Sequence, residues 1–185
     1  MPDEQWLHEI YLAHYKRLYT IGRLFAGREP VHTQAVEDMV QEAFLVLWNK
    51  RDKLFMHPNI GGWLVETMRG QMLNYLRKKK RHNARLAFSL DEEDTEPRVA
   101  STAFELPEDA LMQKENLETL KTLLGDENAG LFYSYCVENQ GSGEIAKAYG
   151  LSESCVRMRV MRLKKTILEN KDLFMVVIAV LLVTK

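Results

Sequence analysis

Two stretches of the sequence concentrate basic and polar side chains, one near the middle of the chain and one toward its C-terminus. In the C-terminal stretch, aliphatic residues recur at helical spacing between arginines and lysines. Such a helix has an apolar back that packs on its own domain and a basic front that can reach base edges in the major groove and hold phosphates. The candidate DNA-binding residues of this front are Ser152, Glu153, Ser154, Arg157, Arg159, Arg162 and Lys164. We expect the first four to face bases and the last three to contact mainly the DNA backbone.

The residues before this stretch have the spacing of the first helix and turn of a helix-turn-helix. Ala146 is small where a second helix would cross the first, and Gly150 suits a turn that needs a positive φ. Ser152 is a favourable N-cap residue because its side-chain oxygen can accept a backbone N–H. We therefore predict a helix-turn-helix over residues 142–167. The alternative, an amphipathic helix with a solvated basic face, explains the charges but not this spacing.

The middle stretch ends a predicted helix that runs from about Trp63 to Arg81. Apolar residues at helical spacing form one face of it, namely Leu64, Val65, Met68, Met72 and Leu76. Its last turns carry a basic block made of Arg77, Lys78, Lys79, Lys80 and Arg81, and Arg85 follows a turn later. A helix with this charge binds duplex DNA mainly through salt-dependent contacts with phosphates. The alternative is a basic helix end that only complements the helix dipole.

Two further amphipathic segments precede this helix. The first is predicted over Glu4–Phe25, and the second has apolar residues from Val36 to Leu47 at i, i+3, i+4 and i+7 positions. The opposite face of the second segment carries Glu37, Asp38, Gln41 and Glu42. No alternating pattern long enough to build a sheet occurs outside the C-terminal tail, so we predict an all-α fold.

The charge distribution divides the chain into two domains. Its 185 residues are 46% hydrophobic and 28% charged, which is typical of a globular protein, and the net charge of -1 conceals a strong local segregation. After the basic block, residues 87–108 are acidic, polar and aperiodic, as in a flexible linker. We predict two small helical domains, at residues 1–86 and 109–170, joined by this flexible acidic linker. The second is the helix-turn-helix domain.

An apolar tail, residues 171–185, follows the second predicted domain. Its run from Leu173 to Val183 is unbroken but shorter than the about 20 residues that a membrane-spanning helix needs. The run could form a buried strand or helix, a docking segment or a peripheral membrane contact. We favour packing against the protein itself or a partner over membrane contact, because short apolar runs usually belong to a core.

Several classes of function lack their sequence signals. The two cysteines, Cys136 and Cys155, form no CxxC pair, and the five histidines have no ligand spacing, so we expect no metal site and no cofactor. The sequence contains no P-loop, HExxH or GxSxG motif, so we expect neither enzymatic activity nor a small-molecule substrate. The N-terminus is acidic where a secretion signal is basic, which predicts a cytoplasmic protein.

Three segments resemble, in order and spacing, the sigma factors of the sigma-70 family, and specifically the extracytoplasmic-function (ECF) group. Val36–Trp48 is similar to the family's "EDLVQEVFLRLW" helix, and residues 62–81 resemble the promoter-binding helix that follows it. Residues 143–159 resemble the last helix-turn-helix of the family. Together the segments cover residues 5–168, and three ordered motifs are more specific than any one of them.

The resemblance implies a transcription initiation factor that lends promoter recognition to core RNA polymerase. Asp38, Gln41 and Glu42 would bind the polymerase clamp, although the residue pattern alone indicates only a solvated helix face. The residues that the resemblance implies at the −10 promoter element are Asn59, Trp63, Asn74, Arg77, Lys78 and Arg81. The helix-turn-helix would bind the −35 element of promoter DNA. An anti-sigma factor is a further partner that the family implies.

In the family, the loop over residues 53–62 holds an unstacked promoter base, for which aromatic and apolar walls are suited. Gly61 and Gly62 depart from the family's more usual Pro-Arg-Ala before the tryptophan, and we expect them to loosen this loop. The main alternative function is a stand-alone helix-turn-helix regulator that acts without polymerase, which leaves Asp38–Trp48 unexplained. A third alternative, a protein-interaction module with a membrane-seeking tail, explains only Leu173–Val183.

Overall fold

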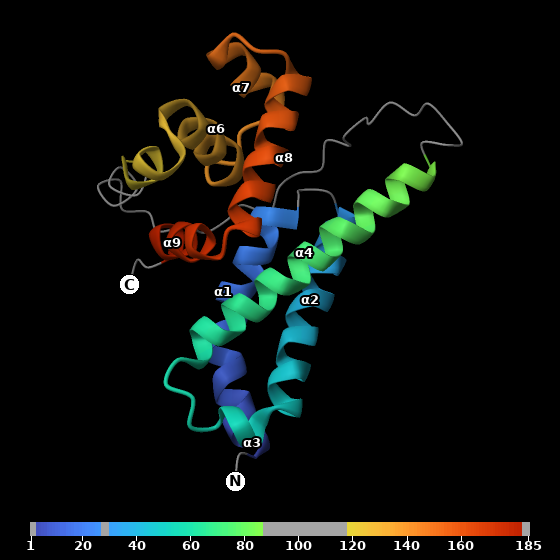
Figure 1. The fold of residues 1–185 in the computed structure, drawn as a ribbon, viewed down its shortest axis with the longest axis vertical. Helices are drawn as coiled ribbons and strands as arrows, with labels where there is room; N and C mark the ends of the chain where they lie inside the picture. The colour runs from blue at the N-terminus through green and yellow to red at the C-terminus, as the bar shows by residue number, and fades with distance from the viewer. Residues whose placement is uncertain (1–2, 27–29, 87–117, 183–185) are drawn as a thin grey trace. The chain divides into compact units, whose positions relative to one another are not determined.

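The computed structural model describes residues 3–26, 30–86 and 118–182 of the chain. The regular elements of this part of the chain are helices, without a strand (Figure 1). The predicted all-α fold is therefore confirmed. The positions that recur at helical spacing in the sequence are, for the most part, the ones that these helices bury.

The chain divides into two compact units, Met1–Ala100 and Ser101–Lys185. Each unit has a core of aliphatic and aromatic side chains. The predicted acidic linker, residues 87–108, lies outside the described residues. The predicted start of the second domain, residues 109–117, lies outside them as well.

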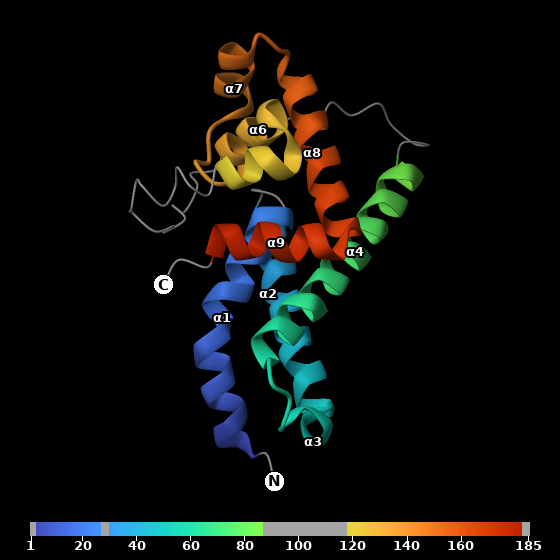
Figure 2. The same ribbon diagram turned by 60° about the vertical axis from the view of Figure 1, so that its left-hand side comes forward.

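Unit 1 is built from α1 (Glu4–Ala26), α2 (Pro30–Asn49), the short α3 (Arg51–Leu54) and α4 (Ile60–Leu86). The three long helices α1, α2 and α4 pack on one another (Figures 1 and 2). Their shared core consists of Leu18, Ile21, Leu24, Phe25, Val36, Val40, Ala43, Leu47, Leu64, Val65, Met68 and Met72.

α1 and α2 run antiparallel, and contacts along their seam fix the register. Close to the connection between them, Arg23 Nη1 donates to Thr33 Oγ1 at 2.6 Å. Further along the seam, the ring centroids of Tyr11 and Phe44 are 4.9 Å apart. A Cβ at Gly22 would lie 2.5 Å from a side-chain atom of α2. The missing side chain at this glycine therefore lets the helices approach closely.

The structure corrects the predicted start of α4. The helix begins at Ile60, so Gly61 and Gly62 lie in its first turn and not in a loop before it. Asn59 Oδ1 accepts the backbone N–H of Gly62 at 2.7 Å, which satisfies one of the donors that a helix start leaves unpaired. A Cβ at Gly61 would lie 2.7 Å from His14 Cε1 of α1. The two glycines thus belong to a packed helix start, and the expectation that they loosen a loop is wrong.

Unit 2 contains a helical segment at 118–124, followed by α6 (Asp126–Cys136), α7 (Ser142–Tyr149), α8 (Glu153–Glu169) and α9 (Lys171–Leu182). α8 is the central helix, and α6, α7 and α9 each pack against it (Figure 2). The buried core of the unit includes Leu120, Ala129, Leu131, Phe132, Ile145, Val156, Val160, Ile167, Leu168 and Phe174.

α7, the turn after it and α8 form the predicted helix-turn-helix. Gly150 ends α7 in the left-handed conformation, with φ 63° and ψ 33°, which glycine adopts without a steric penalty. The backbone N–H of Leu151 donates to the carbonyl of Ala146 at 2.9 Å. Ser152 is the N-cap of α8, and its Oγ accepts the N–H of Cys155 at 3.2 Å. These local contacts fix the turn between the two helices.

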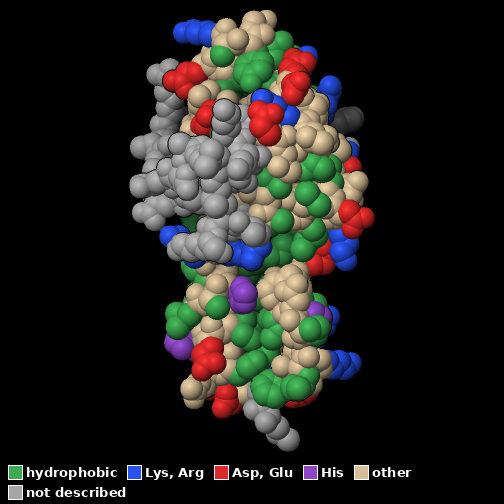
Figure 3. Space-filling view, turned by 90° about the vertical axis from the view of Figure 1, so that its left-hand side faces the viewer, with side chains coloured by type: hydrophobic (Ala, Val, Ile, Leu, Met, Phe, Trp, Pro, Cys, Tyr) green, Lys and Arg blue, Asp and Glu red, His purple; other side chains and the backbone are tan. Residues whose placement is uncertain are grey.

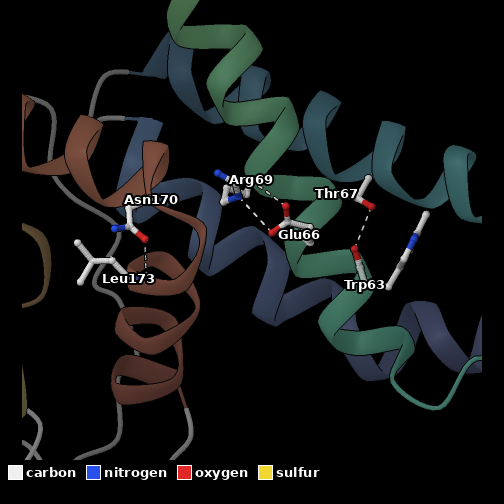
Figure 4. A network of polar contacts seen from close by, with 6 residues as sticks. All are labelled: Trp63, Glu66, Thr67, Arg69, Asn170 and Leu173. Atoms are coloured by element: carbon white, nitrogen blue, oxygen red, sulfur yellow. Dashed lines mark hydrogen bonds and ion pairs between the residues drawn. The ribbon is translucent and has the colours of Figure 1, made fainter.

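The apolar tail forms α9, one face of which is buried. Asn170 separates α8 from α9, and its Oδ1 accepts the N–H of Leu173 at 3.0 Å (Figure 4). The buried residues recur at i, i+3, i+4 and i+7 and are Phe174, Val177, Ile178 and Leu181. Of the alternatives that the sequence left open, the tail therefore takes the form of a helix packed on α8. Among the described residues, no helix combines the length and the apolar character needed to cross a membrane.

Candidate nucleic-acid and protein interfaces

The three predicted polymerase-binding residues share one exposed face of α2. Asp38, Gln41 and Glu42 are all exposed, while the opposite face of the helix is buried in the core of unit 1. Leu45, 56% exposed, continues the same row one turn further on. The structure therefore brings the three polar residues together on a surface that a partner can reach, beside an exposed aliphatic side chain.

A row of tyrosines on α1 borders α2 and was not among the predicted site residues. The ring centroids of Tyr11 and Tyr15 are 5.0 Å apart, and those of Tyr15 and Tyr19 are 6.1 Å apart. Burial raises the pKa of Tyr15, and the neighbouring Tyr11, Glu37 and Tyr19 raise it further. Because Glu37 belongs to α2, the row lies along the seam between the two helices. The i, i+4, i+8 spacing was visible in the sequence, but only the packing of α2 shows what the rings border.

Exposed hydrophobic side chains mark unit 1. They gather on the face of this unit that the lower part of Figure 3 shows. Among the described residues of this unit, the large exposed ones are Tyr11, Leu12, Leu45, Phe55 and Met56. Met56, 85% exposed, lies in the loop between α3 and α4, and the Phe55 ring before it lies 5.9 Å from the ring of Trp6. This loop thus offers an apolar wall of the kind against which an unstacked base can pack.

Asn59 and Trp63 lie at the end of this loop and in the first turn of α4. The Oδ1 of Asn59 is engaged as the helix cap, so its side-chain NH₂ is the group left to meet a base. Trp63 is half-buried, and Lys50 Nζ lies 5.9 Å from its ring centroid. Its carbonyl accepts a hydrogen bond from Thr67 Oγ1 at 2.9 Å (Figure 4). Part of the indole therefore stays exposed beside a cation at the start of α4.

His14 of α1 packs against the same helix start. Burial lowers the pKa of His14 below 6.5, and the charge of Arg17 lowers it further. The N-terminus of a helix carries a partial positive charge, which also disfavours a second positive charge beside it. A neutral imidazole therefore suits the position against Gly61.

The predicted DNA-binding residues at the basic end of α4 lie on its exposed surface, and they are Asn74, Arg77, Lys78 and Arg81. Lys79, between them in the sequence, instead contacts the buried His32, with 3.1 Å between its Nζ and Nε2 of the imidazole. Tyr75 Oη lies 2.6 Å from Nδ1 of the same ring. Because an ammonium group only donates, Nε2 of His32 accepts and Nδ1 carries the hydrogen toward Tyr75.

The predicted DNA-binding residues of the helix-turn-helix fall into groups that differ in their surroundings. The exposed ones, including the N-cap, are Ser152, Glu153, Ser154 and Arg162. The other two arginines near the start of the helix have acidic partners. Arg157 Nη1 lies 3.4 Å from Glu153 Oε2, and Arg159 forms an ion pair with Glu127 of α6. The helix therefore presents a basic surface whose positive charge is partly neutralised by Glu153 and Glu127 of the same unit.

Lys164 departs from its predicted role as a backbone contact. Its side chain belongs to the core of unit 2, since the residue is only 9% exposed, and its Nζ lies 5.3 Å from the centroid of the Tyr135 ring. Position 164 follows the buried Val160 by four residues, so the aliphatic part of the lysine continues the apolar stripe. An ammonium group held over a buried ring does not reach a phosphate, and the prediction for this residue is wrong.

The described part of the chain contains no group of three or more His, Cys, Asp or Glu side chains that could hold a metal ion. Cys136 is buried and Cys155 is half-buried, and the two thiols form no disulfide.

Residues 10–82 match the family model of sigma-70 region 2. The chain therefore contains a sigma-70 region 2. It is also similar to the probable RNA polymerase sigma factor RfaY of Xanthomonas campestris pv. campestris, with 30% identity over 138 residues. The matched part covers 72% of this chain and 33% of the relative, so the chain spans about a third of that relative's length. No solved structure matches the chain.

The matched region 2 spans most of α1, all of α2 and α3, and most of α4. It contains the exposed face of α2, the loop before α4 and the exposed Asn74, Arg77, Lys78 and Arg81. The match ends at residue 82, so the helix-turn-helix of unit 2 rests on its own geometry.

Proposed function

We propose that this protein is an ECF-type sigma factor of the sigma-70 family, which binds core RNA polymerase and directs promoter recognition and transcription initiation. The observation that carries the proposal is the match of residues 10–82 to sigma-70 region 2, in a chain that also contains a helix-turn-helix. The similarity to a probable sigma factor supports it. The protein acts by binding and carries out no catalysis of its own.

The exposed face of α2 is the proposed contact with the polymerase clamp. Asp38 and Glu42 provide negative charge and Gln41 provides an amide, and none of the three is held by an ion pair within the described residues. Such a face attracts a basic partner and orients its approach. The exposed Leu45 next to it adds the apolar contact that interfaces bury at their centre.

The −10 side of the promoter is assigned to the loop before α4 and to α4 itself. The exposed Phe55 and Met56, with the half-buried Trp63, provide walls for an unstacked base, and the Asn59 amide provides a donor. The basic end of the helix would hold duplex DNA through Asn74, Arg77, Lys78 and Arg81. This arrangement combines base capture and phosphate binding on one helix and the loop that leads into it.

The −35 side is assigned to α8 and its N-cap. The residues that would face bases are Ser152, Glu153, Ser154 and Arg157. The exposed Arg162 would contact a phosphate, and Arg159 would do so after leaving Glu127. These contacts require the N-terminal end of the helix to enter the major groove.

Transcription initiation places the proposed site of action in the cytoplasm. An anti-sigma factor is the further partner that this function implies, and it would cover the polymerase and DNA faces. The alternative function, a stand-alone helix-turn-helix regulator, is favoured by one observation only, the complete turn at Gly150 and cap at Ser152. It gives no role to the exposed face of α2.

Binding to core RNA polymerase tests the proposal. The full chain is expected to bind core enzyme, and Asp38→Ala/Gln41→Ala is expected to weaken the complex about tenfold or more, which corresponds to about 1.4 kcal/mol. A matched control is Gln5→Ala/Glu9→Ala, which removes one amide and one carboxylate from an exposed surface of α1 in the same unit. This control is expected to change the dissociation constant less than about twofold.

Circular dichroism and thermal unfolding of all three proteins show whether they are folded. Failure of the folded wild-type chain to bind core enzyme would refute the proposed function and favour the stand-alone regulator. Equal losses in the two double variants would show that the exposed face of α2 has no special role.

A further inference from the structure

The two arginines nearest the start of α8 are held by acidic groups of their own unit. Arg159 forms an ion pair with Glu127 of α6, and the hydrogen bond to Glu127 raises the pKa of Arg159. Arg157 Nη1 lies 3.4 Å from Glu153 Oε2 and 3.5 Å from Ser142 Oγ of α7. Both arginines are therefore engaged before any DNA is present.

The Glu153 carboxylate is seated against the start of α7. A Cβ at Gly143 would lie 2.9 Å from its Oε1, so the glycine leaves the space that the carboxylate fills. The negative charge also lies near the N-terminal end of α7, where the helix dipole favours it. Glu153 is thus placed by the α7–α8 turn, and its other oxygen is directed at Arg157.

Arg162, by contrast, is exposed and has no ion-pair partner among the described residues. The carboxylates of the two pairs are themselves accessible, since the side chains of Glu153 and Glu127 are 57% and 60% exposed. Ion pairs at this level of exposure are weak and reversible. A phosphate that approaches α8 could therefore replace either carboxylate.

We propose that Glu127 and Glu153 are positioning residues that occupy the guanidinium groups of Arg159 and Arg157 in the free protein and yield them to DNA phosphates or bases. This inference rests on the proposed function, because it takes α8 as the DNA-binding helix. The consequence is that two cations of the DNA-binding surface are neutralised in the isolated chain. Duplex DNA then binds weakly, since it must displace two carboxylates as well as its own counterions.

The experiment is a salt series of duplex DNA binding by the full-length chain, measured by fluorescence anisotropy with a labelled duplex of mixed sequence. Glu127→Gln and Glu153→Gln keep the side-chain shape but remove the negative charge. Each is expected to tighten binding by about two- to fivefold at low salt, which is the range expected for an exposed ion pair. The double variant is expected to steepen the dependence of log K on log salt, by up to about 0.9 for each arginine released.

Glu118→Gln is the matched control. Its carboxylate also pairs with a cation, at 2.7 Å from Lys121 Nζ, but that lysine does not belong to α8. The change in net charge is the same, so any general effect of charge on DNA binding appears in this variant too. The proposal is overturned if Glu127→Gln and Glu153→Gln strengthen binding no more than Glu118→Gln, or if they weaken it.

The variant Arg162→Ala shows whether a negative result contradicts only this inference or also the proposed function. It is expected to weaken duplex binding whatever the glutamates do, because Arg162 is exposed on α8. If Arg162→Ala weakens binding while the two glutamate variants match the control, only the positioning role fails. If Arg162→Ala has no effect either, the assignment of α8 to DNA fails and the positioning role fails with it. Thermal unfolding shows that each variant remains folded.

Discussion

Gly22 lies where the three long helices of unit 1 meet. A Cβ at this position would lie 2.5 Å from Val36 Cγ1 and 2.8 Å from Met68 Cε. Gly22→Ala is therefore expected to destabilise the unit by about 1–3 kcal/mol, the usual cost of overpacking a core. The control is Gly70→Ala in α4, where a Cβ would meet nothing within 4 Å. That change is expected to stabilise the helix by about 0.5–1 kcal/mol. Thermal unfolding measures both, and similar shifts for the two variants would contradict the packing described at Gly22.

The lowered pKa of His14 predicts a pH dependence of stability. Because the unfolded chain binds a proton near pH 6.5 and the folded chain binds it only at lower pH, protonation favours unfolding. The stability of unit 1 should fall as the pH drops from 6.5 through the folded pKa, and this contribution should level off below it. His14→Gln removes the titrating group. Its unfolding midpoint, measured at a series of pH values from about 8 to 5, should therefore decline less than that of the wild type. Parallel curves would show that His14 does not contribute.

Residues with local roles could be predicted from the sequence, and residues with distant partners could not. Gly150 and Ser152 act within a few residues of themselves, through a turn and a cap, so their types and spacing were sufficient. Lys164 was assigned by charge alone, yet its ammonium lies over Tyr135 of another helix. The pairing of Arg159 with Glu127 likewise depends on how α6 packs on α8, which no local pattern encodes.

At the scale of elements, the turn of the helix-turn-helix depends on the left-handed Gly150. An alanine at φ 63° places its Cβ close to the backbone, and Gly150→Ala is expected to cost about 1–2 kcal/mol of the stability of unit 2. Gly150→Asn is expected to cost less, because asparagine tolerates this conformation better. Thermal unfolding of both variants tests the order. A smaller loss for alanine than for asparagine would contradict the described turn.

The packing of α9 gives a second prediction at this scale. Phe174 is fully buried, whereas Val176, two residues later, is 42% exposed. Phe174→Ala is expected to destabilise the protein by about 3–5 kcal/mol, as for a large aromatic residue removed from a core. Val176→Ala is the control and is expected to cost less than about 1 kcal/mol. Denaturant unfolding measures both changes. A small loss for Phe174→Ala would show that the tail is not part of the core.

Long elements were predictable because their apolar residues repeat over several turns. The helices found as α1, α2, α4 and α8 all have such a repeat in the sequence, whereas α7 was predicted from the helix-turn-helix spacing. The short α3 has four residues, which is too few for a period to appear. The predicted start of α4, at about Trp63, lies after the observed start at Ile60, because Gly61 and Gly62 suggested a break in the helix. Asn59, which caps this helix, was the sequence signal that could have corrected it.

At the scale of the whole molecule, the two units carry different binding surfaces. Unit 1 presents the exposed face of α2 together with the loop and basic end of α4, while unit 2 presents the helix-turn-helix. A promoter has two recognition elements, and the proposed function uses one unit for each. The residues of both candidate surfaces could be grouped from the sequence because each surface lies on one helix or on consecutive elements. In the proposed function, the way in which the two units act on one DNA molecule depends on the complex with polymerase and not on the sequence of this chain alone.

The most direct test of the proposed function is transcription in a purified system. Core RNA polymerase is incubated with a library of genomic fragments, with and without the full-length chain, and the 5′ ends of the transcripts are determined. We expect the chain to direct initiation at sites that share two sequence elements. We expect Asp38→Ala/Gln41→Ala to reduce the yield about tenfold or more. Transcripts no more abundant or specific than those of core enzyme alone, from a chain shown to be folded, would contradict the assignment as a sigma factor.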